Sequence, residues 1–235
     1  MQEAQLLTIL GIGFVLGARH ALDTDHIVAI STMLSRHPNL RTSGLIGFSW
    51  GCGHTAVLLL VGLAVLTLNL AIPRSLAAVL EFAVGIMLVV LGASLAHTIW
   101  RDRWHLHSHQ HDGQTHLHLH NHAWQEDHAH RHWVGGYLRP FLVGMVHGLA
   151  GSAALILIIL SAVRTPLEGM AYIFVFGIGS ILGMMVLGVL ISLPILFSAS
   201  IGRPIQMALQ GLISVGSIGV GVAIMVGVVL QSPLN

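Results

Sequence analysis

Six long apolar runs limit the folds that this sequence can adopt. They lie near residues 5–34, 43–70, 76–99, 138–163, 168–197 and 205–231. At about 1.5 Å per residue, a helix of about 20 apolar residues spans a hydrocarbon core roughly 30 Å thick. The runs are continuously apolar instead of alternating, which favours membrane helices over barrel strands. We therefore predict an all-α polytopic membrane protein with six transmembrane helices.

The few charged residues indicate how the predicted helices cross the membrane. Charged residues make up only 8% of the chain and the net charge is +1, so the charge predicts no nucleic-acid partner. Most arginines lie in the first, third and fifth connections: Arg36, Arg41, Arg101, Arg103, Arg131, Arg139 and Arg203. Only Arg74 and Arg164 lie in the second and fourth. The positive-inside rule then places both termini outside the cytoplasmic (inner) membrane and the third connection in the cytoplasm.

The first three runs and the last three share a pattern. A shift of 127 residues superimposes Phe14, Gly17, His20 and Leu22 on Phe141, Gly144, His147 and Leu149. A shift of 126 superimposes Phe48, Gly51 and Gly53 on Phe174, Gly177 and Gly179. Because each half has three helices, the pattern predicts two inverted repeats, although glycine-rich helices can also match by chance. The expected units are a first half (1–100), a histidine-rich loop (101–133) and a second half (134–235).

Ionisable residues gather inside the first run, in the stretch GARHALDTDHIVAI at 17–30. A charged side chain in the middle of a membrane costs about 2.5–3.5 kcal/mol, so such residues usually mark a pathway or a site. On an ideal helix His20, Asp23 and His26 share an arc of about 120°. Asp25 joins them only if the helix unwinds there. The alternative is a shorter helix that ends at the membrane surface, where an arginine pairs with an aspartate.

Two further histidines are candidates for the same site. His54 lies in the second run, in FSWGCGHTA, and His147 is the repeat counterpart of His20. His54 alone would be interpreted as a hydrogen-bonded core residue, and Cys52 as a packing residue. Imidazole and carboxylate ligands together suit nickel, cobalt, zinc or copper, whereas magnesium and calcium prefer oxygen ligands alone. The predicted metal ligands are His20, Asp23, Asp25, His26, His54 and His147.

The loop between the halves carries most of the histidines of the chain. They alternate with other residues: His105, His107, His109, His111, His116, His118, His120, His122, His128, His130 and His132. An extended chain would bring alternate imidazoles to one side, where pairs can chelate a metal. With few apolar residues, we expect the loop to be disordered without metal. We interpret it as a metal collector or sensor; a pH sensor and a solvated spacer are the alternatives.

The motif RHALDTDHI, Arg19 to Ile27, resembles the H-x4-D-H signature of the nickel/cobalt transporter superfamily. The resemblance implies that His20, Asp25 and His26 recognise the metal, with Asp23 as an additional acid. FSWGCGHT is similar to the family's Phe-Ser-x-Gly-His signature, with two extra residues before the histidine. No counterpart of its Phe-Asp-Thr signature is found. VHGLAGSAAL, in that region, looks more like the shorter urease-accessory and nickel-resistance branches.

The resemblance implies a transporter of nickel, cobalt or both. We expect the ion, with Zn²⁺ as a further candidate, to be a transported ligand and not a permanent cofactor. It would be held in the membrane while the two halves alternate around it. The expected partners are the lipid bilayer and a cytosolic metallochaperone or a maturation factor of a nickel enzyme. No motif indicates an enzyme. The alternatives are a membrane metallochaperone without ion flux and a haem-binding electron carrier.

Overall fold

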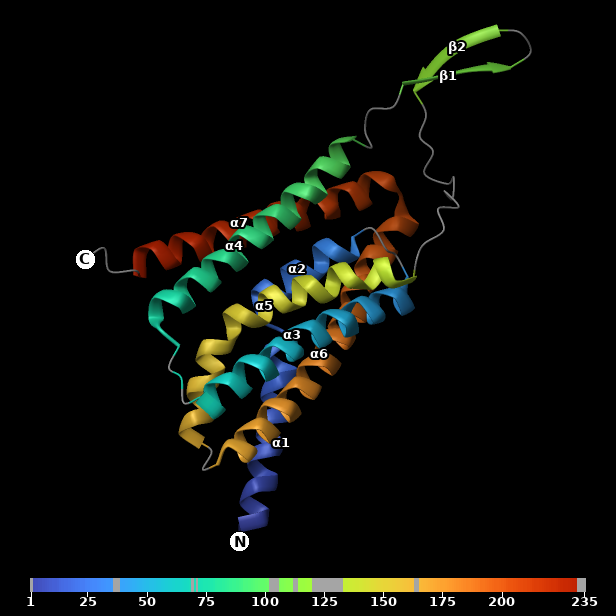
Figure 1. Ribbon diagram of the computed structural model, residues 1–235. Helices are drawn as coiled ribbons and strands as arrows, with labels where there is room; N and C mark the ends of the chain where they lie inside the picture. The colour runs from blue at the N-terminus through green and yellow to red at the C-terminus, as the bar shows by residue number, and fades with distance from the viewer. Residues whose placement is uncertain are drawn as a thin grey trace.

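The computed structural model describes residues 2–35, 39–68, 70, 72–101, 106–111, 114–119, 133–162 and 165–231. Within them the chain forms seven helices and one two-stranded sheet (Figure 1). The helices are α1 (Gln2–His20), α2 (Thr24–Leu34), α3 (Leu40–Leu68), α4 (Arg74–Arg101), α5 (Trp133–Ala162), α6 (Pro166–Ile201) and α7 (Arg203–Gln231). The strands are β1 (Leu106–His111) and β2 (Gln114–Leu119).

The first predicted helix, 5–34, is interrupted within its polar stretch and forms α1 and α2. The backbone N–H of Leu22 donates to the carbonyl of Arg19 at 2.8 Å, and that of Asp23 donates to the carbonyl of His20 at 3.1 Å. Asp23 has extended backbone (φ −63°, ψ 146°) and precedes α2. Aspartate and threonine favour helix boundaries because their side chains compete for backbone hydrogen bonds. The described residues thus form seven helices where the sequence predicted six.

Four helices are long and apolar enough to cross a membrane, judged by length and composition over the described residues. These are α3, α4, α6 and α7. The apolar part of α1, Leu7–His20, is shorter than these four. Large apolar side chains remain exposed on the outer faces of the helices, for example Leu60, Val79 and Leu212. The helical bundle with apolar outer faces is that of an integral membrane protein.

Glycines allow α1 and α6 to cross at very short range. A Cβ atom at Gly17 would collide with the backbone carbonyl of Phe176, and one at Gly179 with the carbonyl of Phe14. The hydroxyl of Ser180 also donates to the carbonyl of Gly17 at 3.1 Å. Such small-residue packing is typical of membrane helices, because lipid supplies no hydrophobic drive for their association.

The crossing of α3 with α5 has the same construction. A Cβ atom at Gly53 would collide with the carbonyl of Phe141, and one at Gly144 with the carbonyl of Trp50. This crossing includes Gly53, the residue next to His54, and places α5 directly against the polar part of α3. The two crossings therefore determine how closely the helices that carry the candidate ligands approach one another.

The remaining long helices, α4 and α7, lie side by side along one edge of the molecule (Figure 1). The hydroxyls of Ser214 and Ser217 donate across this interface to the carbonyls of Gly92 and Leu88, each at 2.8 Å. Serine hydroxyls are common cross-links between membrane helices. They join α4 to α7 independently of the glycine crossings described above.

The short helix α2 packs between the α4–α7 pair and α6. Its residues Ile30 and Leu34 are fully buried in the main apolar core, together with Trp50 and Met184. At the end of α2 the side-chain amide of Gln210 donates to the carbonyl of Ser35 at 2.9 Å. These contacts hold α2 in the core, although no continuous helix connects it to α1.

Within the predicted histidine-rich loop, β1 and β2 pair as an antiparallel hairpin. In their register His107 pairs with His118, and His109 pairs with His116. Other predicted loop ligands lie outside the described residues: His105, His120, His122, His128, His130 and His132. The expectation that the loop as a whole is disordered without metal therefore stays a prediction.

Candidate metal centre

The break between α1 and α2 brings the predicted ligands of the first segment together. His20 ends α1 and His26 lies in the first turn of α2, yet their ring centroids are only 4.6 Å apart. The Nδ1 atom of His20 lies 2.7 Å from Oδ2 of Asp23, in the break itself. The carboxylates of Asp23 and Asp25 thus pair with histidines, and no ion pair joins either of them to Arg19 within the described residues.

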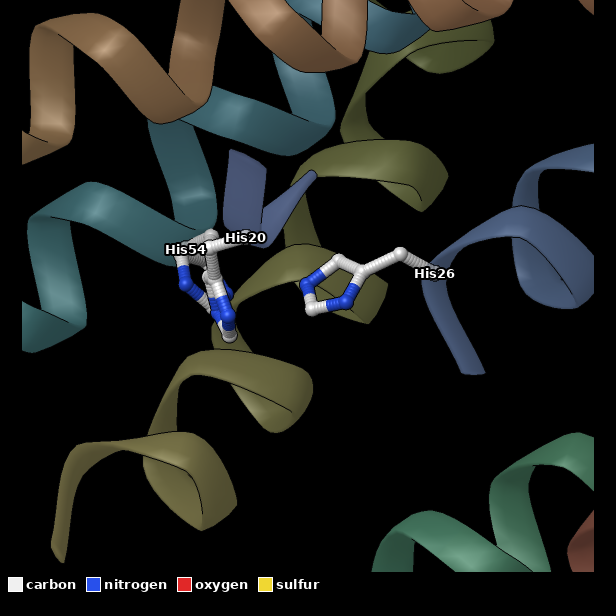
Figure 2. Close-up of side chains that lie close together, drawn as sticks. All are labelled: His20, His26 and His54. Carbon is white, nitrogen blue, oxygen red and sulfur yellow. The ribbon is translucent and has the colours of Figure 1, made fainter. Parts of the chain in front are cut away.

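His54 reaches the same place from α3. Its side chain is fully buried, and its ring centroid lies 5.2 Å from that of His20 and 5.4 Å from that of His26. Figure 2 shows the imidazoles of His20 and His54 together on one side, with the ring of His26 pointing toward them from α2. Three separate helices therefore each contribute one imidazole to a common point.

His147 adds a contact from α5, in the second half of the chain. Its Nε2 atom lies 2.8 Å from Oδ2 of Asp25. The other oxygen of that carboxylate, Oδ1, lies 3.2 Å from Nδ1 of His26 and accepts the backbone N–H of His26 at 3.0 Å. Asp25 therefore bridges two buried histidines, one from each half of the chain.

Several nitrogen atoms in this cluster have no hydrogen-bond partner among the described residues. They are Nε2 of His26, Nδ1 and Nε2 of His54, Nδ1 of His147 and Nε1 of Trp50. A buried polar atom without a partner costs about 1–3 kcal/mol. Packing alone does not compensate the unfavourable energy of several unpaired polar atoms at one point. Such a group therefore indicates a site that binds a ligand.

Two overlapping groups of side chains have ligand atoms within 4.8 Å of one another. One comprises His20, His26 and His54, and the other comprises Asp25, His26 and His147. Imidazole nitrogens with nearby carboxylates suit borderline divalent ions of the nickel, cobalt and zinc type. The six residues named from the sequence thus meet in one cluster, and their role as ligands stays a prediction.

Trp50 belongs to the cluster and was not identified from the sequence. Its ring stacks on that of His26 at 5.4 Å with an interplanar angle of 26°. It also lies 5.7 Å from the ring of His147. The sequence pattern that could have identified it is its place in FSWGCGHTA. Trp50 lies one helical turn before His54, which puts both on the same face of α3.

Other candidates lie away from the cluster. Cys52 is a free, half-buried thiol, consistent with a packing role. His97 is exposed near the end of α4, with its ring 6.2 Å from that of Trp100. The loop residues His107, His109, His111, His116 and His118 lie on the hairpin strands.

The sequence was compared with known proteins. It matches the family NicO, described as high-affinity nickel-transport protein, over residues 6–232. It is also similar to the urease accessory protein UreH of Bacillus sp. (strain TB-90), with 40% identity over 200 residues, or 85% of this chain and 82% of that protein. No solved structure matches the chain.

Proposed function

Because the chain belongs to the NicO family of high-affinity nickel-transport proteins, we propose that it carries Ni²⁺ across the membrane through the cluster of His20, Asp23, Asp25, His26, His54 and His147. Membership of this family confirms the resemblance carried by the H-x4-D-H motif. It also makes the chain a transporter rather than an enzyme. The observation that carries the proposed site is the convergence of buried, unpartnered imidazole nitrogens from α2, α3 and α5.

Co²⁺ is a second substrate of the same site in this proposal, with Zn²⁺ as a weaker candidate. All three ions accept imidazole nitrogen and carboxylate oxygen, so the ligand types alone do not separate them. Selectivity then depends on coordination geometry and on the groups that orient the ligands. In each case the ion is cargo and is released after each cycle.

The proposed mechanism is alternating access between two inverted repeats. The two glycine–carbonyl contacts between α1 and α6 correspond, under the shifts of 127 and 126 residues, to the two contacts between α3 and α5. A twofold axis between the halves predicts this relation, because it would map the α1–α6 crossing onto the α5–α3 crossing. The hydrogen bond between Asp25 and His147 crosses from one half to the other. Because Asp25 also contacts His26, a rotation of one half against the other would move the cluster.

The proposed orientation has the histidine-rich loop in the cytoplasm and both termini outside the inner membrane, as the arginine distribution indicates. On that side the loop would collect metal ions. The backbone register is compatible with this role, because it pairs His107 with His118 and His109 with His116. A cytosolic metallochaperone or a nickel-enzyme maturation factor would be the partner that exchanges the ion with the loop.

The transport proposal is tested by nickel flux into vesicles that contain the purified protein and an enclosed nickel-sensitive dye. Wild type and His97→Ala are expected to transport nickel, whereas His54→Ala is expected to lose most of the flux. His97 is the matched control, since it is a histidine outside the cluster. Equal insertion is checked by the amount of protein in the vesicles.

Other outcomes would identify another function. Nickel binding without flux in wild type would contradict transport and favour a membrane metallochaperone. A Soret band in the purified protein would favour a haem-binding electron carrier. Full flux in His54→Ala would leave transport intact and remove the proposed site.

A further inference from the structure

Each aspartate of the motif contacts the Nδ1 atom of a neighbouring histidine. Asp23 contacts Nδ1 of His20 at 2.7 Å, and Asp25 contacts Nδ1 of His26 at 3.2 Å. A carboxylate on Nδ1 keeps the proton on that nitrogen and leaves Nε2 free as a metal ligand. In both histidines of the motif, the aspartate contact therefore selects the same tautomer, with the proton on Nδ1.

The free nitrogens point to one place. Nε2 of His26 has no partner among the described residues, and neither nitrogen of His54 has one. His20, His26 and His54 offer ligand atoms within 4.8 Å of one another. Since Nδ1 of His20 and Nδ1 of His26 are already in contact with carboxylates, the two Nε2 atoms and one nitrogen of His54 remain for the ion.

From this geometry we infer that Asp23 and Asp25 are positioning residues, and that the transported ion binds to the three imidazoles of His20, His26 and His54. The inference rests on the proposed function, because it divides the proposed cluster into ligands and supporting groups. It assigns the aspartates a different role from that of direct ligands, which the motif alone suggested for them.

The second group of close ligand atoms fits this division. Asp25, His26 and His147 are joined by hydrogen bonds of 2.8 and 3.2 Å, so their atoms already satisfy one another. An ion placed among them would have to displace both bonds, whereas an ion at the three imidazoles would meet the unpartnered nitrogens of His26 and His54. His147 therefore holds Asp25, and Asp25 holds His26.

The ring of His26 is fixed in two ways. Trp50 stacks on its face, with 5.4 Å between the ring centroids. The contact of Nδ1 with Asp25 determines the side-chain torsion that orients the ring. His20 has a single carboxylate contact and is more exposed, with 21% of its side chain accessible compared with 1% for His26. Two negative charges next to the three ligands also favour a doubly charged ion without joining its coordination sphere.

Cysteine substitution distinguishes the two roles, because sulfur bound to nickel is recognised by X-ray absorption. In a Cys52→Ser background, we would load His20→Cys, Asp23→Cys, Asp25→Cys and the control His97→Cys with Ni²⁺ in detergent. A nickel–sulfur bond is expected in His20→Cys only. A nickel–sulfur bond in either aspartate variant, or none in His20→Cys, would overturn the assignment.

A second measurement uses variants that preserve the shape of the side chains. Asp23→Asn and Asp25→Asn are expected to lower nickel affinity 10- to 100-fold, the usual effect of losing a supporting carboxylate. The spectrum of bound nickel should still show three histidines, as in wild type and in the control Glu168→Gln, which lies in the first turn of α6. A carboxylate ligand seen on nickel in wild type and lost in Asp25→Asn would support direct ligation and contradict the proposal.

These binding measurements are independent of flux. If wild type binds nickel through three histidines but no flux into vesicles occurs, the transport proposal fails and the division of roles stands. If flux occurs and nickel is bound to sulfur in Asp25→Cys, transport stands and the division of roles fails.

Discussion

At the scale of single residues, His54 has the most unfavourable burial in the cluster when no metal is bound. Both of its ring nitrogens are buried without a partner among the described residues, and its side chain is fully buried. Burial without hydrogen bonding costs about 1–3 kcal/mol for each such group. A protein that keeps this residue in its core gains something from it other than stability.

His54→Leu is therefore expected to stabilise the metal-free protein while removing nickel binding. The apolar side chain eliminates two unsatisfied atoms, so thermal unfolding in detergent without metal should shift upward by a few degrees, an effect on the order of 1 kcal/mol. Added nickel should raise the unfolding temperature of wild type and leave that of the variant unchanged, because only a folded state that binds the ion is stabilised by it. A variant that is destabilised without metal would contradict this account of His54.

The residues of the cluster could be predicted from their types, but the contacts among them could not. Buried histidine and aspartate in an apolar segment indicate a site because of their cost, and the repeat pointed to His147. That His147 contacts Asp25 and not the ring of His20, its repeat counterpart, depends on how α5 crosses α3. Trp50 was missed because a tryptophan in a membrane helix is usually a packing residue.

At the scale of helices, the glycine crossings are the positions at which a single methyl group matters most. Gly17 and Gly11 both lie in α1, but a Cβ atom at Gly17 meets the carbonyl of Phe176, whereas at Gly11 nothing lies within 4 Å. The two positions therefore form a matched pair on one helix, in which helix propensity is the same and only the contact differs.

Gly17→Ala is expected to destabilise the protein by about 1–3 kcal/mol and to lower nickel flux, because α1 must move away from α6. Gly11→Ala should gain about 0.5–1 kcal/mol, since alanine restricts the unfolded chain more than glycine does. Unfolding in detergent and flux into vesicles measure both effects. Equal behaviour of the two variants would mean that the crossing does not determine the helix positions.

The break after His20 shows the limit of prediction at this scale. The apolar pattern continues through residues 5–34, so the sequence predicted one helix, with unwinding only as an alternative. The chain is interrupted at Ala21–Asp23, where local hydrogen bonds replace helical ones and α2 is held by its own packing against Trp50 and Met184. Contacts from other helices thus decided a choice that local propensity left open. The other five apolar segments each contain one long helix, as predicted.

At the scale of the whole molecule, the membrane potential acts on the proposed cargo. A doubly charged ion entering a negative compartment gains about 4.6 kcal/mol per 100 mV, which is twice the value for a single charge. Import can therefore proceed on the potential alone, whereas export requires a second driving ion. The arrangement of the chain is compatible with either direction of transport.

The histidine-rich loop is expected to affect affinity for the ion more than the maximal rate. Replacing all its histidines from 105 to 132 by serine should raise the nickel concentration for half-maximal flux several-fold, when nickel is supplied on the side of the loop. The maximal flux should stay unchanged, because the intramembrane cluster is intact. Initial rates over a range of nickel concentrations measure both parameters. An unchanged half-maximal concentration would make the loop a spacer.

The interruption of the first membrane segment also has an electrostatic consequence. An α-helix behaves as if about half a positive charge lay at its N-terminus and half a negative charge at its C-terminus. Because α1 ends at His20 and α2 begins at Thr24, both helix ends lie beside the cluster. The negative end of α1 faces the histidine that is most accessible to an arriving cation, and the positive end of α2 faces Asp25. The two helix ends thus help to bind a cation and to keep a carboxylate charged close to each other, which an uninterrupted helix could not do.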